Sequence, residues 1–291
     1  MPAPAHCEDC YVLTIQCPDA VGIVAAVSTF LAEHQAFITE SAHYGDPDTG
    51  RFFMRTVFRS ATTDLLSQDD MAAGFSALAK RFDMSWDLFG SQEKIKAVIA
   101  VSKFGHCLND LLHRVQIGGI PVEVTGVVSN HDTFRDLVEW HEIPFHHLPM
   151  TPETKIAQEE KLLDVMTSTK AEVLALARYM QILSPDLCAK LPGRIINIHH
   201  SFLPGFKGAR PYHQAHTRGV KIIGATAHYV TPDLDEGPII EQAVERVDHT
   251  LSPEDLVLLG QDIESSVLSR AVRWHAERRV LLNGTKTVVF R

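Results

Sequence analysis

The sequence lacks three features that mark large classes of proteins. It has no excess of positive charge, because 27 Lys and Arg stand against 36 Asp and Glu and give a formal net charge of −9 at pH 7. Nucleic-acid binding needs clustered Lys and Arg, so nucleic acid is not expected as a partner. No run approaches the roughly 18 uninterrupted apolar residues of a membrane span. The N-terminal stretch MPAPAHCEDCYVLTIQ has no basic segment followed by an apolar core, so we expect neither a secretory signal nor a membrane partner.

Cysteine is also scarce. Five scattered cysteines, an odd number, favour a reducing cytosol over a disulfide-bonded secreted protein and predict a cytoplasmic location. Cys7 and Cys10 form a CxxC pair ahead of the first predicted strand. A zinc site would need further ligands at similar spacing, and a redox pair would stand at the start of a helix. A metal or redox role for this pair is therefore not favoured.

The remaining composition is typical of a folded globular protein, with 45% hydrophobic and 22% charged residues. The 291 residues fit one large domain or two ordinary ones, and no repeat is present. A change of pattern near Lys94 favours two domains, over residues 1–90 and 91–291, with the junction at Ser91–Lys94.

The first ninety residues predict a small α+β unit. Runs rich in β-branched and aromatic residues alternate with segments whose apolar residues have helical spacing. The resulting order, β-α-β-β-α-β, is the ferredoxin-like pattern. Asp19 is expected to cap the first helix. The expected elements cover, in order, residues 11–17, 23–35, 37–45, 51–59, 67–82 and 84–89.

The second part of the chain alternates strands and helices from about residue 94. Its first strand, KIKAVIAVSK, is nearly all apolar, as expected for a buried parallel strand. The alternation predicts a doubly wound, mostly parallel, Rossmann-like α/β domain, closed by a helix over 252–279 and a short strand. The expected elements before them cover residues 94–103, 107–118, 122–130, 131–142, 143–150, 155–170 and 172–178.

Polar residues follow β-rich runs in three segments of this second domain. The segments are ARYMQILSP (177–185), INIHHSFLP (196–204) and AHYVTPDLDEGPII (227–240), and the glycines and prolines of 197–215 leave little room for helix. In doubly wound folds, ligands bind at the carboxyl ends of the strands, so these residues are expected to meet there. The candidate site residues are Asn197, His199, His200, Ser201, His228 and Asp235.

A metal site is one interpretation of these residues. His199 and His200 are adjacent, so in an extended strand their side chains point to opposite faces and cannot both be ligands. His199 with His228 and Asp235 could still hold a metal, but no HxH or HxxxH spacing supports it. We therefore expect no metal, with His199 facing the chemistry and His200 pointing elsewhere.

Nucleophilic catalysis is weaker, because Ser201 lacks the GxSxG context of a nucleophile elbow. The residue types fit a third interpretation better. The amide of Asn197 can donate to a developing oxyanion, and His199 can carry a proton near neutral pH. Asp235 can accept a proton or orient His199 and a water molecule. Such a set, without a metal, suits attack on an activated acyl group.

The motifs NIHHSFLPGFKGARPYHQA and HYVTPDLDEGPII resemble those of the folate-dependent formyltransferase family, over about residues 94–280. The resemblance implies that Asn197, His199 and Asp235 are catalytic and act on 10-formyltetrahydrofolate. His228 would support them, with His200, which stands where the family has proline, and Ser201. The segment ARYMQILSP matches the folate-binding loop, which implies that backbone groups of Met180, Gln181, Ile182 and Leu183 hold the pterin ring. No tightly bound cofactor is implied.

The stretch CPDAVGIVAAVSTFLAEH with GRFFMRTVF resembles the ACT domain, a ligand-sensing or oligomerising module, over about residues 8–90. The resemblance implies an amino-acid effector of the glycine or methionine class near Asp19, Gly22 and Ile23, where free helix N–H groups could hold a carboxylate. It equally allows a module that only builds a dimer or tetramer.

The combination of the two modules implies a hydrolase of one-carbon and purine metabolism. The loop SKFGHCLNDLL (102–112) lacks the glycine-rich pattern with which the family's glycinamide ribonucleotide transformylases cradle a phosphate. An ACT module ahead of the formyltransferase fold implies that water replaces the acceptor amine and yields formate and tetrahydrofolate. Asp235 and His199 would activate the water, and Asn197 and His199 would stabilise the oxyanion. Formyl transfer to an amine and a non-catalytic folate or amino-acid sensor remain the alternatives.

Overall fold

The computed structural model describes residues 10–62, 67–204 and 211–291, so Cys7 of the CxxC pair lies outside the described residues. The chain divides into two compact units, and the first is discontinuous in sequence. The first unit comprises Met1–Glu93, Glu277–Asn283 and Val288–Arg291, and the second comprises Lys94–Ala276 and Gly284–Thr287.

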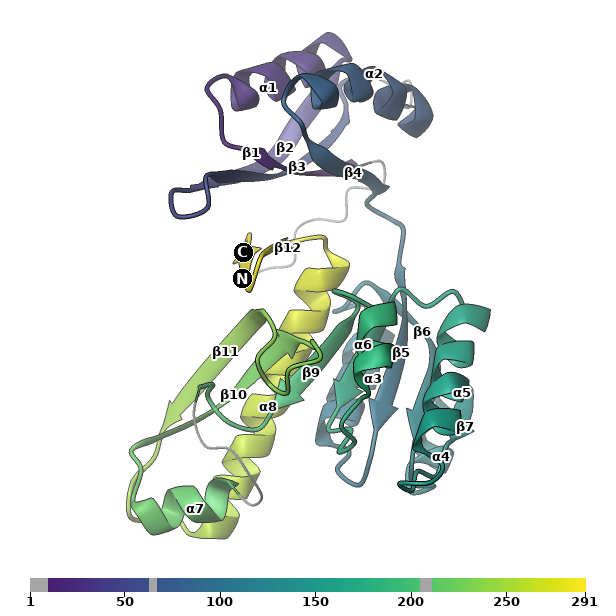
Figure 1. Cartoon of the computed structure of the whole chain (residues 1–291), viewed down its shortest axis with the longest axis vertical. Coiled ribbons are helices and arrows are strands. Elements are labelled where there is room, and N and C mark those ends of the chain that lie inside the picture. Colours follow the sequence, from purple (N-terminus) through teal and green to yellow (C-terminus); the bar gives the residue numbers. More distant parts are fainter. Residues whose placement is uncertain (1–9, 63–66, 205–210) are drawn as a thin grey trace. The chain divides into compact units, whose positions relative to one another are not determined.

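The first unit contains a four-stranded antiparallel sheet with the strand order β2-β3-β1-β4. Helices α1 and α2 lie on one face of this sheet (Figure 1). The predicted β-α-β-β-α-β order is confirmed. The elements are β1 (Cys10–Pro18), α1 (Ile23–Glu33), β2 (Ala36–Asp46), β3 (Arg51–Ser60), α2 (Gln68–Arg81) and β4 (Ser85–Gly90).

Helix α1 packs on the sheet through its apolar stripe. Ile23, Val27 and Leu31 recur at helical spacing and are buried. The helix begins differently from the prediction, because Gly22 occupies the N-cap position and no side chain caps the first turn. The expectation that Asp19 caps this helix is therefore wrong. A φ of 95° at residue 22, which favours glycine, sets the start of the helix.

The second face of this sheet is covered by residues near the C-terminus. Phe53 of β3 is fully buried and packs with Leu281 and Phe290. Two short strands, β12 (Val280–Asn283) and β13 (Lys286–Val289), form a sheet of their own where one short strand was expected. Strand β3 thus buries side chains on both faces of the sheet.

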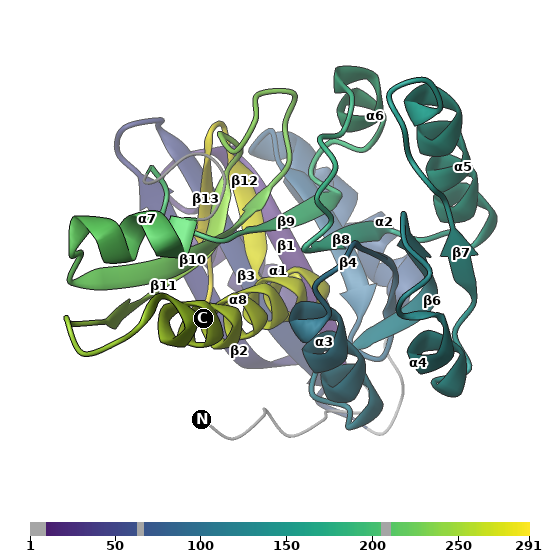
Figure 2. The same ribbon diagram turned by 90° about the horizontal axis from the view of Figure 1, so that it is seen from below.

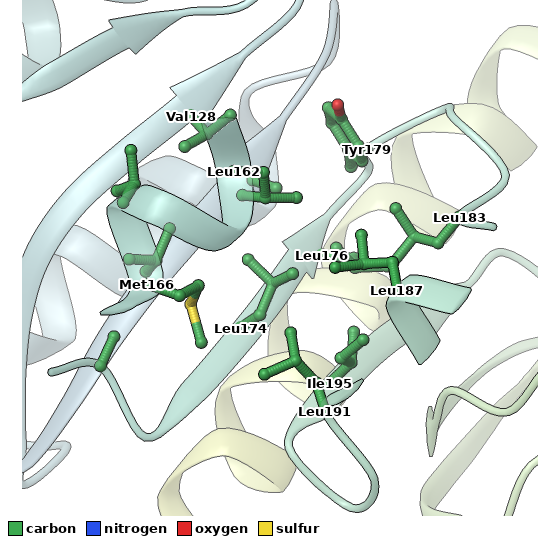
Figure 3. Packing of buried hydrophobic residues seen from close by; sticks show 14 of the residues in the cluster. Val128, Leu162, Met166, Leu174, Leu176, Tyr179, Leu183, Leu187, Leu191 and Ile195 are labelled. Atoms are coloured by element: carbon green, nitrogen blue, oxygen red, sulfur yellow. The ribbon is translucent and has the colours of Figure 1, made fainter. Parts of the chain in front are cut away.

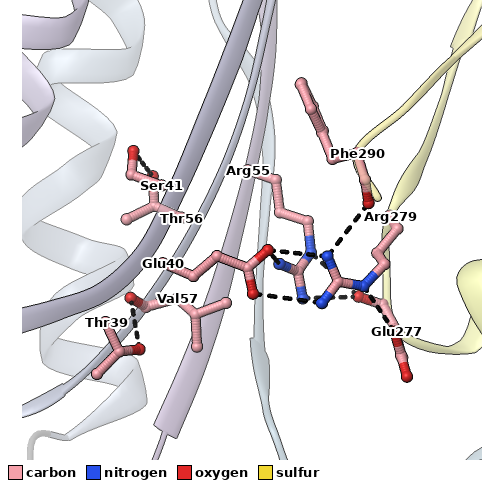
Figure 4. A network of polar contacts seen from close by, with 9 residues as sticks. All are labelled: Thr39, Glu40, Ser41, Arg55, Thr56, Val57, Glu277, Arg279 and Phe290. Atoms are coloured by element: carbon pink, nitrogen blue, oxygen red, sulfur yellow. Dashed lines mark hydrogen bonds and ion pairs between the residues drawn. The ribbon is translucent and has the colours of Figure 1, made fainter. Parts of the chain in front are cut away.

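A polar network fixes the C-terminal segment on this sheet (Figure 4). One carboxylate oxygen of Glu40 lies 2.8 Å from Nη1 of Arg55 and 2.8 Å from Nη1 of Arg279. Arg55 is 4% exposed and also donates two hydrogen bonds, of 3.2 and 3.0 Å, to the carbonyl oxygen of Glu277. Arg279 in turn donates to the carbonyl oxygen of Phe290. Two guanidinium groups therefore satisfy backbone carbonyls that would otherwise lose water on folding.

Arg55→Met is expected to destabilise the first unit by about 2–4 kcal/mol, because the Glu277 carbonyl and the Glu40 carboxylate lose buried hydrogen bonds. Native-state hydrogen exchange of the β3 amides measures this loss. Arg59→Met is the matched control, since Arg59 lies on the same strand but is exposed, and it should change stability by less than about 0.5 kcal/mol. Equal effects of the two substitutions would contradict a stabilising role for the network.

The second unit contains a seven-stranded sheet with the order β11-β10-β9-β8-β5-β6-β7. Strands β7, β6, β5, β8 and β9 are parallel, and β10 and β11 join antiparallel. Helices α3 and α8 lie on one face and α5 and α6 on the other (Figure 2). The mostly parallel, doubly wound prediction is confirmed. The elements are β5 (Ile95–Val101), α3 (His106–Gln116), β6 (Val122–Ser129), α4 (Arg135–Trp140), β7 (Phe145–His147), α5 (Lys155–Ser168), β8 (Val173–Ala177), α6 (Pro185–Lys190), β9 (Ile195–His199), α7 (Pro211–Arg218), β10 (Ile222–Tyr229), β11 (Ile239–Arg246) and α8 (Pro253–Ala276).

The core of this unit fixes the strands that carry the candidate site. Leu162 and Met166 of α5 and Leu187 of α6 pack against Leu174 of β8 and Ile195 of β9 (Figure 3). These side chains are almost completely buried, each contributing roughly 1.5–3 kcal/mol by removal from water. The carboxyl ends of β8 and β9 therefore sit on a rigid base.

Helix α7 departs from the expectation that the stretch up to residue 215 leaves little room for helix. It begins at Pro211, and proline is compatible with a first helical position because that residue's N–H would have no partner in the helix. In the part of the chain that the structure describes, no helix combines the length and apolar character needed to cross a membrane.

Candidate active site

A cavity of about 690 Å³ opens in the second unit where β5, β8 and β9 end. Strand order reverses here, because β5 is followed in the sheet by β6 on one side and by β8 on the other. At such a switch point the loops that follow the two neighbouring strands run in opposite directions, and a crevice opens between them. Both the segment after β8 and the end of β9 line the cavity.

Three polar side chains share one face of the sheet beside this cavity. Asn197 and His199 alternate along β9, so their side chains point to the same face. The antiparallel register places His228 of β10 opposite Asn197. All three residues line the cavity. These three of the six candidate residues therefore lie together at the cavity.

His228 fixes the orientation of the Asn197 amide. Its Nδ1 lies 2.9 Å from the carbonyl oxygen of Tyr229, so Nδ1 carries the proton and donates. In the neutral ring Nε2 is then an acceptor, and it lies 3.2 Å from Nδ2 of Asn197, which donates. This proton assignment follows from the hydrogen-bond partners. It leaves the second N–H of Asn197 available to a ligand in the cavity.

Asp235 reaches the site by a route that the sequence did not predict. It lies in the loop after β10, and because β10 is antiparallel, its carboxyl end is paired with the amino-terminal part of β9, at Ile196. The loop therefore folds back toward His199. A Cβ at Gly237 would lie 1.8 Å from the carbonyl oxygen of Tyr229, so only glycine permits this close approach. Asp235 itself has a φ of 58°, which aspartate tolerates better than most residues.

Asp235 and His199 form a hydrogen-bonded pair. Nδ1 of His199 lies 3.3 Å from Oδ2 of Asp235, whereas Nε2 of His228, which accepts from Asn197, lies 3.6 Å from Oδ1 and is too far away for a hydrogen bond. The hydrogen bond from His199 is the main cause that lowers the pKa of Asp235 well below its usual range. The carboxylate is thus ionised at neutral pH and directs the Nδ1 proton of His199. Nε2 of His199 is buried and has no hydrogen-bond partner among the described residues.

His200 also lines the cavity, which corrects the expectation that it points elsewhere. Strand β9 ends at His199, so the alternation of side chains does not extend to residue 200. The two imidazole rings lie with centroids 4.9 Å apart. Burial lowers the pKa of His200 from 6.5 to about 4, and the charges of Arg178 and His199 add to this effect. His200 is therefore a neutral neighbour of His199 at pH 7.

The lowered pKa of His200 predicts a pH dependence of stability. Between about pH 4 and 6.5 the unfolded chain binds this proton more readily than the folded protein, so the free energy of unfolding rises with pH and levels off above that window. The full contribution is about 3 kcal/mol. Urea denaturation at several pH values should show that His200→Gln removes most of this slope, whereas His249→Gln, at an exposed position, keeps it. A slope unchanged in His200→Gln would contradict this expectation.

The predicted folate segment, Met180 to Leu183, lines the cavity throughout. The N–H of Met180 donates to the hydroxyl of Ser102 at 3.0 Å, and this hydroxyl donates to Oδ1 of Asn130 at 2.7 Å. Ser102 and Asn130 follow β5 and β6, so three strand ends hold the start of the segment. Ser201, by contrast, does not line the cavity, and its carbonyl oxygen accepts a hydrogen bond from Thr226.

The sequence did not point to a second set of polar residues in this cavity. Arg178 and His106 stand close behind β8 and β5, where the rule about strand ends could have found them. Tyr212 lies in helix α7, inside the motif of residues 197–215 but without a predicted role, and Glu264 lies in α8, where no motif marks it. The apolar side chain of Phe104 lines the cavity beside them.

The residues predicted to bind an effector lie in different environments. Asp19 is exposed, and Gly22 borders a shallow groove between α1 and α2. Ile23 is 1% exposed and belongs to the core of the first unit, so its side chain cannot contact a ligand. Effector binding at this position stays a prediction.

Comparisons with known proteins show where this combination of units occurs. A family model described as Formyl transferase matches residues 95–272. Formyltetrahydrofolate deformylase of Corynebacterium sp. (strain P-1) is 54% identical over 282 residues, which cover 97% of this chain and 98% of the relative. That of Bacillus subtilis (strain 168) is 50% identical over 284 residues, which cover 97% and 94%.

Solved structures show the same relation. The crystal structure of Formyltetrahydrofolate deformylase from Burkholderia mallei ATCC 23344 matches with a TM-score of 0.93 and 52% identity, covering 97% of this chain and 100% of that chain. The crystal structure of glycinamide ribonucleotide transformylase 1 from Symbiobacterium toebii matches with a TM-score of 0.63 and 30% identity, covering 68% of this chain and 95% of that chain. The similarity to the transformylase therefore leaves about a third of this chain unmatched.

Proposed function

This chain belongs to the formyltetrahydrofolate deformylases of the formyl transferase family, and on that premise we propose that Asn197, His199 and Asp235 hydrolyse 10-formyltetrahydrofolate to formate and tetrahydrofolate. The observation that carries this assignment is the hydrogen-bonded arrangement of Asp235, His199, His228 and Asn197 along one cavity. It orients a basic nitrogen and an amide donor beside the segment that matches the folate loop.

His199 is the proposed proton carrier of the reaction. Its Nε2 takes a proton from water as the water oxygen bonds to the formyl carbon, and Asp235 stabilises the imidazolium through Nδ1. The same proton then passes to N10 as the bond between carbon and N10 breaks. Formic acid and tetrahydrofolate result, and formic acid loses its proton to water. The low pKa of Asp235 makes it a poor base, which favours His199 over Asp235 as the proton acceptor.

Asn197 is the proposed donor to the oxyanion. The tetrahedral intermediate carries a negative charge on the former formyl oxygen, and a fixed amide N–H in a water-poor site stabilises it. His228 holds the amide in place from its second side and is a positioning residue. The N–H that would donate to the oxyanion is the one that does not donate to His228.

The folate segment supports the proposed substrate. The side chain of Leu183 is buried in the core, whereas those of Met180 and Ile182 are exposed, so the backbone between them is held at the cavity wall. Leu176 and Val230 give the same cavity an apolar lining suited to a flat aromatic ring. We propose that backbone N–H and carbonyl groups of residues 180–183 bind the pterin.

The decisive experiment measures formate release from 10-formyltetrahydrofolate with and without an added amine. Hydrolysis predicts the same rate of release in both, with tetrahydrofolate formed in equal amount. Release that requires the amine would show a transferase instead. Binding of the folate without any release would show a sensor.

A further inference from the structure

The cavity contains a second polar cluster that takes no part in the proposed reaction. Glu264 of α8 is its centre, with a side chain that is 1% exposed. Nε2 of His106 lies 2.8 Å from Oε2 of Glu264, and the hydroxyl of Tyr212 donates to Oε1 at 2.6 Å. Nη1 of Arg178 lies 3.4 Å from Oε2. We call these four residues the Glu264 cluster.

The carboxylate of this cluster is ionised. Burial alone would raise the pKa of Glu264, but the hydrogen bond from His106, the charge of Arg178 and the hydrogen bond from Tyr212 together lower it. A buried carboxylate that accepts three polar contacts holds its partners firmly. Each of the four side chains therefore has a fixed place in the wall of the cavity.

A cation is a poor ligand for this cluster. Donor atoms of His106, Cys107 and Glu264 do lie within 4.8 Å of one another, as metal ligands would. However, His106 and Tyr212 already engage both oxygens of Glu264, and the guanidinium of Arg178 stands beside them. Its positive charge repels a metal ion at this distance.

Arg178 itself is incompletely satisfied. Its Nε and Nη1 are buried and make no hydrogen bond within the described ranges, although Nη1 lies 3.4 Å from Oε2 of Glu264. The guanidinium is always charged, and it lies 5.4 Å from the centre of the Phe104 ring. A fixed cation in the wall of a cavity, with two nitrogens that make no hydrogen bond, is suited to a small anion.

We propose that Arg178, held by Glu264, binds a small monocarboxylate in this cavity, namely the formate that the reaction releases. This proposal rests on the proposed function, because hydrolysis is what generates formate here. Arg178 is the residue that follows β8, and its charge acts on His200, whose ring lies beside that of His199. Formate released at His199 thus has a cation in the wall of the same cavity.

The affinity of this subsite is expected to be low. Formate has three non-hydrogen atoms, which limits its dissociation constant to about 1 mM at best. The neighbouring carboxylate of Glu264 weakens anion binding further. Weak binding suits a product that must leave before the next turnover.

Titration of the intact protein with formate, in the absence of folate, tests the proposal by saturation-transfer NMR on the formate proton. The wild type should bind in the millimolar range, and Arg178→Met should bind at least about tenfold more weakly. Arg178→Lys keeps the charge and should retain part of the affinity. Arg135→Met is the matched control, because Arg135 also pairs with carboxylates and lies over an aromatic ring, but outside the cavity.

Unchanged formate binding in Arg178→Met would overturn the assignment. Should that variant not fold, the wild type gives a second test, because formamide has the shape of formate without its charge. Formamide is expected not to displace formate, and displacement at equal concentration would refute recognition by charge. Displacement by p-aminobenzoylglutamate, itself lost in Arg178→Met, would show that Arg178 binds the glutamate carboxylates of the substrate instead.

The two hypotheses fail separately. A wild-type protein that binds formate through Arg178 but releases none from 10-formyltetrahydrofolate would refute the proposed hydrolysis and leave the anion site in place. A protein that hydrolyses the substrate but whose formate binding does not depend on Arg178 would refute the anion site alone.

Discussion

Asp235→Asn is expected to lower kcat by about 10³- to 10⁴-fold while folate binding is nearly unchanged. Two effects combine. The imidazolium of His199 loses the negative charge 3.3 Å from its Nδ1, and the new amide can donate to Nδ1, which places the ring proton on Nε2. The nitrogen that should accept a proton from water then already carries one. Formate release gives kcat, and a fluorescence titration with tetrahydrofolate gives the binding constant.

Asp233→Asn is the matched control for this substitution. Asp233 lies in the same loop, two residues before Asp235, but is exposed and does not line the cavity. Its replacement should leave kcat at the wild-type value. A value of kcat for Asp235→Asn close to that of Asp233→Asn would show that Asp235 neither orients His199 nor stabilises its charged form.

Asn197→Ala is expected to lower kcat by about 10²- to 10³-fold, with little change in KM. The amide donates to the oxyanion, which exists only after water has attacked, so its removal affects the transition state more than the bound substrate. Asn197→Asp should lower kcat by at least as much, because it keeps the shape of the side chain but directs a negative charge at the oxyanion.

Asn109→Ala controls for loss of an asparagine amide as such. Asn109 lies on α3, is exposed, and donates to the backbone carbonyl of Gly105. Its replacement should leave both kinetic constants unchanged. An effect of Asn197→Ala confined to KM would mean that the amide binds the substrate and gives no additional stabilisation to the transition state.

The side-by-side placement of Asn197 and His199 could be predicted because it depends on local geometry alone. Two residues separated by one position in a strand share a face wherever the strand lies. The prediction that the His200 side chain points away from the site was wrong, because the direction of this side chain depends on where β9 ends. That end is set by pairing with β10, about 30 residues later, and β10 pairs with β9 only up to His199.

The approach of Asp235 to His199 could be expected, but its cause could not. The sequence suggests a common edge of parallel strands, whereas the structure uses an antiparallel β10 and a loop that folds back. That fold depends on the contact of Gly237 with Tyr229. A glycine in a loop is too common for its sequence position alone to reveal such a contact.

The Glu264 cluster could not be predicted from the sequence, for a different reason. Glu264 meets His106 across 158 residues and Tyr212 across 52, and neither separation forms a motif. The same holds for the network in the first unit, where Arg55 and Glu277 are 222 residues apart. Fold class follows from local periodicity, but polar clusters of this kind arise only when distant segments have been brought together by that fold.

The discontinuity of the first unit has a consequence for synthesis on the ribosome. Its sheet is complete in sequence at Gly90, yet Leu281 and Phe290, which cover one of its faces, are made about 200 residues later. At about 5–20 residues per second, this delay amounts to roughly 10–40 seconds. During that interval the C-terminal residues that pack against Phe53 and Arg55 in the finished protein have not yet been made. The part of the protein that is made first is thus among the last to reach its final form.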